Sequence, residues 1–149
     1  ILNTGIFFRH AERQPMQKVL GIGGVFLRSK DPKSLSEWYR KHLGLPIEPE
    51  WHGAVLPGIP LGMDPVPGIW SAFPEDTSYF GDSRNQVMVN FVVRDVQLMV
   101  DQLREMDCNV DEKVESNEYG TFGWVTDPEG HRIELWQPPA NEAHDGTSS

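Results

Sequence analysis

Two stretches of the chain, 64 residues apart, share one order of elements. Residues 23–48 (GGVFLRSKDPKSLSEWYRKHLGLPIE) and 87–112 (VMVNFVVRDVQLMVDQLREMDCNVDE) both begin with an apolar run that leads into an aspartate. Asp31 and Asp95 are suited to cap a helix because their carboxylates accept the free N–H groups of its first turn, and 95 − 31 = 64. The same offset relates GIWSAFP (68–74) to RIELWQP (132–138). We therefore predict two modules, each made of a strand, a helix and three further strands.

The repeat predicts an α+β fold with a single domain over residues 17–140. One four-stranded sheet with one helix cannot cover both of its faces, so two such modules are expected to lie side by side. Module one spans about 20–75 and module two about 85–138. Together they would form one curved mixed sheet with helices outside and a concave cleft inside. The linker between them contains Tyr79 and Phe80, which we expect to anchor it on the body.

The two ends of the chain lie outside this pattern. Residues 1–16 are predicted to be an extension, either disordered or foreign to the native protein, and residues 141–149 a flexible tail.

Composition narrows the function classes. The formal net charge of −9 argues against a protein that binds nucleic-acid phosphates. The single cysteine, Cys108, excludes an internal disulfide and a cysteine-based metal cluster. No apolar stretch reaches membrane-spanning length. We expect a cytoplasmic protein that binds neither nucleic acid nor membranes.

The segments GIGGVFLRSKDPKSLSEWYRKHLGL and DPEGHRIELWQP resemble the vicinal oxygen chelate superfamily. That superfamily includes glyoxalase I, bleomycin-resistance proteins and extradiol dioxygenases, and the resemblance covers residues 20–138. It implies a pair of βαβββ modules, a small organic ligand in the cleft, and a homodimer, with the modules paired within one chain or between two chains.

The resemblance also implies where a metal would bind. Metal-using members place ligands on the first and last strand of each module, and the 64-residue offset assigns these positions to Gly24, Trp70, Met88 and Glu134. Only Glu134 is a competent ligand for Zn, Ni, Mn or Fe, because the other three offer no nitrogen or oxygen acceptor. We therefore predict no bound metal. The alternative is a divalent metal with Glu134 as its ligand, or Glu134 as a catalytic base.

Strand alternation predicts which side chains line the cleft. Glu134 is the candidate catalytic residue, and it could instead form an ion pair with Arg132 or Arg28. The candidate ligand-binding residues on these strands are Phe26, Arg28, Trp70, Met88, Asn90, Trp124, Arg132 and Trp136. Trp51 and His52 are further candidates, because together with the Pro- and Gly-rich loop 54–68 they could form a lid over the cleft. The aromatic and methionine side chains among them could equally fill a core between the modules.

Three functions are compatible with such a cleft. The favoured one is a metal-free binding protein of the bleomycin-resistance type that holds an aromatic or cationic molecule. The second is a glyoxalase-like lyase or isomerase, or a dioxygenase, that uses Glu134. The third is a dimeric scaffold whose cleft is filled by side chains.

Overall fold

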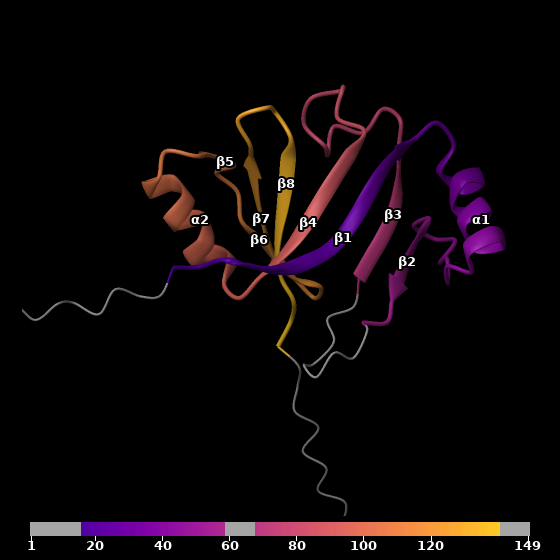
Figure 1. The fold of residues 1–149 in the computed structure, drawn as a ribbon, viewed down its shortest axis with the longest axis horizontal. Coiled ribbons are helices and arrows are strands. Elements are labelled where there is room, and N and C mark those ends of the chain that lie inside the picture. Colours follow the sequence, from indigo (N-terminus) through magenta and orange to yellow (C-terminus); the bar gives the residue numbers. More distant parts are fainter. Residues whose placement is uncertain (1–15, 59–67, 141–149) are drawn as a thin grey trace, which may run out of the picture.

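The computed structural model describes residues 16–58 and 68–140 (Figure 1). The predicted tail, and the predicted extension apart from Met16, lie outside these residues. The elements follow the order β1 (Val19–Ser29), α1 (Pro32–Leu43), β2 (Gly53–Leu56), β3 (Gly68–Pro74), β4 (Val87–Val93), α2 (Val96–Glu105), β5 (Asn109–Val110), β6 (Glu115–Asn117), β7 (Gly120–Thr126) and β8 (Arg132–Gln137).

Both helices begin where the sequence places their caps. The Asp31 carboxylate accepts a hydrogen bond from the Ser34 N–H at 3.0 Å, and the Asp95 carboxylate accepts one from the Leu98 N–H at 2.9 Å. Each bond satisfies an N–H group that a helix start leaves free. Helix α1 ends at Gly44, whose φ of 69° is the left-handed conformation that glycine adopts at little cost.

The strands form one mixed sheet in the order β2-β3-β1-β4-β8-β7-β5, with β6 also paired to β7. Within each module the first strand pairs in parallel with the last, β1 with β3 and β4 with β8. The modules join through antiparallel pairing of β1 with β4. The predicted α+β fold of two βαβββ modules is confirmed, although the first strand after α1 is reduced to a single bridge between Glu48 and Gly53.

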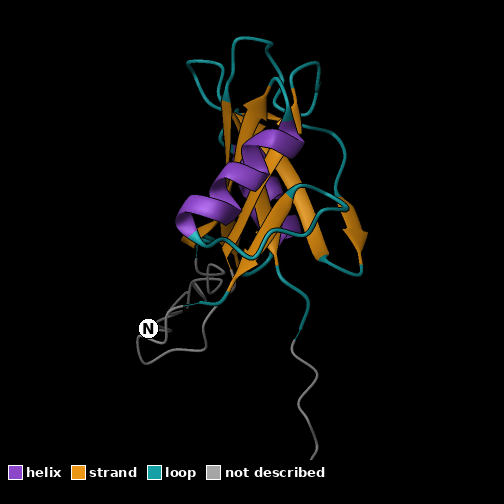
Figure 2. Ribbon diagram, turned by 90° about the vertical axis from the view of Figure 1, so that its right-hand side faces the viewer, coloured by secondary structure: helices purple, strands orange, loops and turns teal. Residues whose placement is uncertain are grey.

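The two faces of the sheet pack against different groups, and a helix can be seen lying across the strands (Figure 2). On the outer face, α2 packs Val96, Met99 and Val100 against Val93 and Leu135 of the sheet. On the inner face, Phe26, Phe80 and Met88 form a second apolar cluster. The linker residue Phe80 is fully buried there, as predicted for an anchor. The helices therefore lie outside, and the inner face is left for the cleft.

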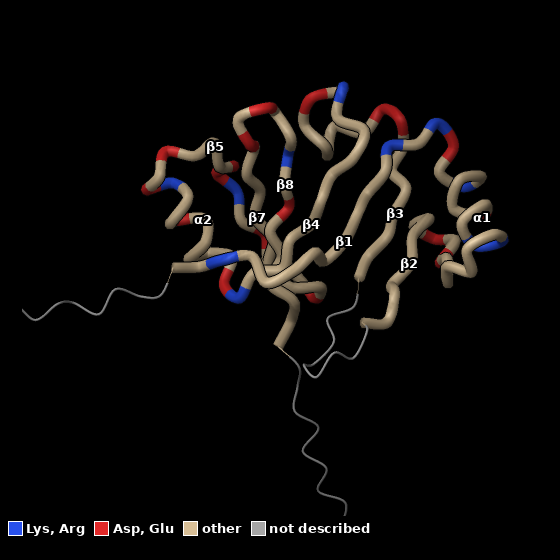
Figure 3. The backbone as a smooth tube through the Cα atoms, in the orientation of Figure 1, with Lys and Arg blue, Asp and Glu red and all other residues tan. Residues whose placement is uncertain are grey.

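Charged side chains gather on the helices and loops and avoid the middle of the sheet (Figure 3). Strands β3 and β4 contain no charged residue, and β1 contains only Arg28. The charge of the molecule is thus concentrated around a central apolar surface. None of the helices within residues 16–58 and 68–140 is long and apolar enough to cross a membrane.

The last strand of module one differs from the sequence alignment by one residue. Val25 and Val89 are equivalent positions of the first strands, since 89 − 25 = 64. Val25 pairs with Trp70 and Val89 pairs with Ile133, so the offset between the last strands is 133 − 70 = 63 rather than 64. A one-residue shift turns every side chain of a strand to the other face. Trp70 therefore lies on the outer face, with its ring 4.3 Å from that of Tyr39 in α1. The prediction that Trp70 lines the cleft is wrong.

We predict that Gly23→Ala destabilises the protein by about 1–3 kcal/mol, because overpacking strains a filled site. Gly23 occupies an irregularity where β1 shifts its register against β4. A Cβ there would lie 2.8 Å from Trp136 and 2.9 Å from Val92, and closer still to the Asn90 amide oxygen. Urea denaturation measures the change. Gly21→Ala is the control, since a Cβ at Gly21 meets nothing within 4 Å; an equal loss in both variants would contradict the steric explanation.

Candidate functional site

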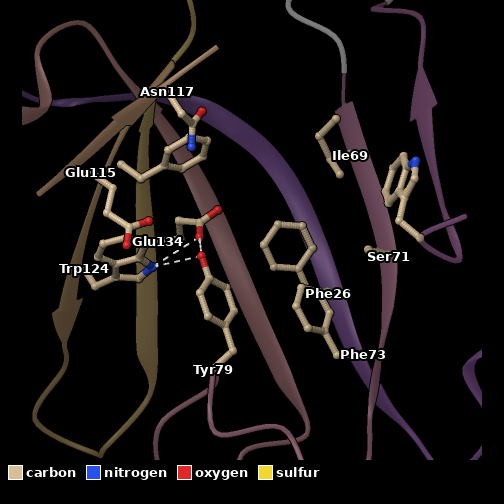
Figure 4. A pocket seen from close by; sticks show the side chains of 11 residues that line it. Phe26, Ile69, Ser71, Phe73, Tyr79, Glu115, Asn117, Trp124 and Glu134 are labelled. Atoms are coloured by element: carbon tan, nitrogen blue, oxygen red, sulfur yellow. Dashed lines mark hydrogen bonds between the residues drawn. The ribbon is translucent and has the colours of Figure 1, made fainter. Parts of the chain in front are cut away.

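A cleft of about 280 Å³ opens on the inner face between the two modules (Figure 4). Module one contributes side chains from β1, β3 and the turn before β2, the linker contributes Tyr79, and module two contributes side chains from β6, β7 and β8. The lining residues are Phe26, Trp51, Ile69, Ser71, Phe73, Tyr79, Glu115, Asn117, Phe122, Trp124 and Glu134. Six of the eleven are aromatic, so the walls are mainly flat apolar surfaces with a few polar groups.

Glu134 is the most buried polar group of the cleft, with 3% of its surface exposed. The Asn90 amide donates a hydrogen bond to its Oε1 at 2.7 Å, and the Trp124 indole N–H donates one to its Oε2 at 3.2 Å. The Tyr79 hydroxyl also donates to Oε2. A carboxylate can accept all three bonds, so its burial is compensated without a cation.

Neither arginine forms the ion pair that the sequence suggested for Glu134. Arg132 pairs with Asp111, and its guanidinium lies 5.6 Å from the ring centre of Tyr79 and 5.1 Å from that of Trp124. Arg132 thus packs on the two aromatic side chains that bind Glu134, as cation–π contacts favour.

Arg28 instead fixes the linker between the modules. Its guanidinium donates to the backbone carbonyl oxygens of Asn85 at 2.9 Å, Glu75 at 2.7 Å and Thr77 at 2.9 Å. These bonds hold the linker over the end of β1 and so position Tyr79, which belongs to the linker. The side chain is engaged by the backbone and does not line the cleft.

Tyr79 is the one linker residue that enters the polar network. Its ring stacks on Phe73 with centres 5.5 Å apart and planes within 1° of parallel. Burial, together with the neighbouring Glu134 carboxylate, raises the pKa of Tyr79 well above its ordinary value of 10.0. The hydroxyl therefore remains a hydrogen-bond donor to Glu134 across the physiological pH range.

Residues 24–136 match the family model described as a glyoxalase-like domain. This match covers most of the chain. The protein belongs to the glyoxalase-like domain family. The predicted membership of the vicinal oxygen chelate superfamily is thereby confirmed, and solved structures of that superfamily share the fold.

Three of these structures illustrate the similarity. A variant of methylmalonyl-CoA epimerase from Streptomyces coelicolor in complex with 2-nitronate-propionyl-CoA is 15% identical with a TM-score of 0.61, over 79% of this chain and 96% of that one. Methylmalonyl-CoA epimerase from Mycobacterium tuberculosis is 17% identical with a TM-score of 0.55, over 81% and 89%. A glyoxalase/bleomycin resistance protein/dioxygenase superfamily member from Vibrio splendidus is 16% identical with a TM-score of 0.50, over 80% and 97%. At these identities the similarity shows the fold alone. No curated protein matches the chain.

The side chains at the four positions that the resemblance assigns to metal ligands do not form a set that suits a divalent metal. With the observed offset of 63 residues between β3 and β8, the counterpart of Glu134 in module one is Ser71 and not Trp70, since 134 − 63 = 71. The set then becomes Gly24, Ser71, Met88 and Glu134, which contains one carboxylate and no imidazole. Within residues 16–58 and 68–140, no three His, Cys, Asp or Glu side chains gather as metal ligands would.

The structure separates the predicted site residues into three groups. Phe26, Trp51, Trp124 and Glu134 line the cleft. Asn90 and Arg132 lie behind them as contacts of the lining side chains. Met88, Trp136, Arg28, His52 and Trp70 do not line it.

Packing or backbone roles account for the residues outside the cleft. Met88 is fully buried beside Phe26 and Phe80. The Trp136 indole donates to the Tyr119 carbonyl oxygen at 2.9 Å, and its ring stacks on Phe122. His52 lies in the turn before β2 with a φ of 54°.

Sequence reasoning missed several lining residues for identifiable reasons. Ile69, Ser71 and Phe73 were assigned to the outer face by the one-residue error in β3. Glu115 and Asn117 belong to a three-residue edge strand that carries no hydrophobic alternation. Tyr79 lies in a linker, and only its aromatic character within a polar segment pointed to a buried position.

We predict that Tyr79→Phe lowers the free energy of unfolding by about 1–3 kcal/mol at neutral pH, because Glu134 loses a charge-assisted hydrogen bond. The loss should depend on pH. The folded-state pKa of Tyr79 is raised, so its contribution is complete below pH 10.0, the ordinary value, and declines as the pH rises above it. The difference between the wild-type protein and the variant should therefore shrink above pH 10.0.

Chemical denaturation at several pH values measures this difference. Tyr119→Phe is the matched control, because Tyr119 is 67% exposed and should tolerate the change at every pH. A constant difference between wild type and Tyr79→Phe across the alkaline range would contradict the role assigned to the hydroxyl.

Proposed function

We propose that this protein binds a small organic molecule, aromatic or cationic, in the cleft between its modules, as a binding protein of the bleomycin-resistance type. The observation that carries the proposal is the combination of lining groups. Six aromatic side chains surround two carboxylates, Glu134 and Glu115, and none of the lining residues within the described ranges is Lys, Arg or His. Aromatic faces and carboxylates both favour a positively charged partner.

The volume and the state of Glu134 support binding of a small ligand. The cleft holds about 280 Å³, which is close to the lower end of typical ligand pockets. Glu134 is held in one position by Asn90, Trp124 and Tyr79 before any ligand arrives. A preorganised acceptor loses little conformational freedom when it binds a donor, so more of the interaction contributes to affinity.

The third function suggested by the sequence, a scaffold whose cleft is filled by side chains, is not favoured, because a cleft of about 280 Å³ remains open between the modules. That the protein forms a homodimer and that it lies in the cytoplasm remain predictions, and both belong to this proposal.

We expect benzamidinium, a flat aromatic cation, to raise the melting temperature more than neutral benzamide, because a ligand that binds only the folded state stabilises it. In Glu134→Gln the affinity for benzamidinium should fall about tenfold, as the loss of a charge-assisted hydrogen bond predicts. Thermal-shift measurements and isothermal titration check both expectations.

Glu105→Gln is the matched control, because it removes the same charge from an exposed position at the end of α2. Equal shifts with benzamidinium and benzamide, or no shift with either, would refute the proposal. The same would follow if Glu105→Gln weakened binding as much as Glu134→Gln.

A metal-dependent lyase, isomerase or dioxygenase is the alternative that the sequence left open, and elemental analysis tests it. The donor set at Gly24, Ser71, Met88 and Glu134 favours no stoichiometric metal in protein purified without chelator. Stoichiometric Zn, Ni, Mn or Fe that is lost in Glu134→Ala would replace the binding proposal with the enzyme.

A further inference from the structure

The two carboxylates of the cleft come from two different strands. A third strand, which carries aromatic side chains, lies between them. Glu134 lies on β8 and Glu115 on β6, and both strands pair with β7. Because neighbouring strands are about 4.8 Å apart, the backbones of β6 and β8 lie roughly 10 Å from each other. Both glutamates line the same cleft (Figure 4).

The strand between the two carboxylates, β7, presents two aromatic side chains to the cleft. Phe122 of β7 pairs with Glu115, and Trp124 of β7 pairs with Glu134. Phe122 also stacks on Trp136 with planes within 9° of parallel, which fixes the orientation of its ring. A ligand that reached both carboxylates would therefore cross two aromatic side chains.

The inner carboxylate has a neighbouring acceptor that lacks a donor. Asn90 is 3% exposed and lies on the inner face, with its amide nitrogen bonded to Glu134. Its amide oxygen is buried and has no hydrogen-bond partner among the described residues. Unsatisfied buried acceptors are uncommon in folded proteins. That amide oxygen lies against Gly23 of β1 and not in the cleft, so the acceptor that a ligand meets on the inner side is the Glu134 carboxylate itself.

The outer carboxylate is available to a ligand. Glu115 pairs with Lys113, but the side chains of Lys113 and Glu115 are 72% and 40% exposed. Such exposed ion pairs are weak and are screened by salt. A cationic group held over the aromatic floor could displace Lys113 from Glu115.

We propose that the ligand is a dication: two protonated nitrogen groups joined by a flat apolar spacer, with one group at Glu134 and the other at Glu115. This inference rests on the proposed function and narrows its ligand class. The spacer lies over Phe122 and Trp124. A ligand with a single positive group bound at Glu134 would leave Glu115 with only its weak partner, Lys113.

Isothermal titration with matched amines tests the inference on the full chain. The probes are para-xylylenediamine and its biphenyl homologue, each compared with the analogue in which a methyl group replaces one aminomethyl group. We expect at least one diamine to bind about fivefold more tightly than its monoamine, as a second, partly exposed ion pair predicts. Glu115→Gln should remove this advantage and leave monoamine binding unchanged, whereas Glu134→Gln should weaken both.

Two further variants keep the result interpretable. Lys113→Met removes the competing ammonium group and should strengthen diamine binding without affecting the monoamine. Glu118→Gln removes the charge of a neighbouring exposed residue that does not line the cleft, and it should change the affinity of neither the diamine nor the monoamine.

The outcomes separate the two proposals. If diamine and monoamine bind equally, and Glu134→Gln weakens both, the dication is refuted while the proposed function stands. If no amine binds, both proposals fail. A diamine advantage that survives Glu115→Gln would also refute the assignment of the outer group.

Discussion

The antiparallel pairing of β1 with β4 is the constraint on which the rest of the structure depends. Each module alone has an apolar inner face and only one helix, on its outer side. When the first strands pair, the inner faces become one continuous surface and the cleft lies across their junction. Phe26 and Met88 are direct partners in this pairing and are both buried under Phe80 of the linker. The pairing of β1 with β4, the apolar cluster on the inner face and the position of the linker therefore depend on the same set of contacts.

The buried carboxylate is supported by residues from every part of this arrangement. The parallel pairing of β4 with β8 places Asn90 beside Glu134, and the antiparallel pairing of β7 with β8 places Trp124 there. Tyr79 arrives from the linker, which Arg28 holds through three backbone carbonyl oxygens. Because three neutral donors satisfy Glu134, both arginines are left for structural roles. The cleft therefore keeps its negative character, which determines the kind of ligand we propose.

The sequence predicted much of the fold but only part of the site. Helix caps at Asp31 and Asp95, the module order and the inner positions Phe26, Met88 and Glu134 follow from local chemistry and strand alternation. The β3 register did not follow, because the chain from β1 to β3 is one residue longer than the chain from β4 to β8, whereas the alignment of GIWSAFP with RIELWQP kept the offset of 64. This error of one residue changed the predicted lining of the cleft, because it placed Trp70 there instead of Ser71.

By itself the sequence determined the duplication, the two capped helices, and a single carboxylate at the positions that the resemblance assigns to metal ligands. These properties depend on residue type and spacing along the chain, which folding does not change. Only the tertiary structure decided which partners Glu134 has, that Tyr79 and Glu115 share its cleft, and that Arg28 and Arg132 face other groups. Such choices depend on which residues, distant in the chain, come within a few ångströms of one another. That proximity is set by strand register and by the path of the linker.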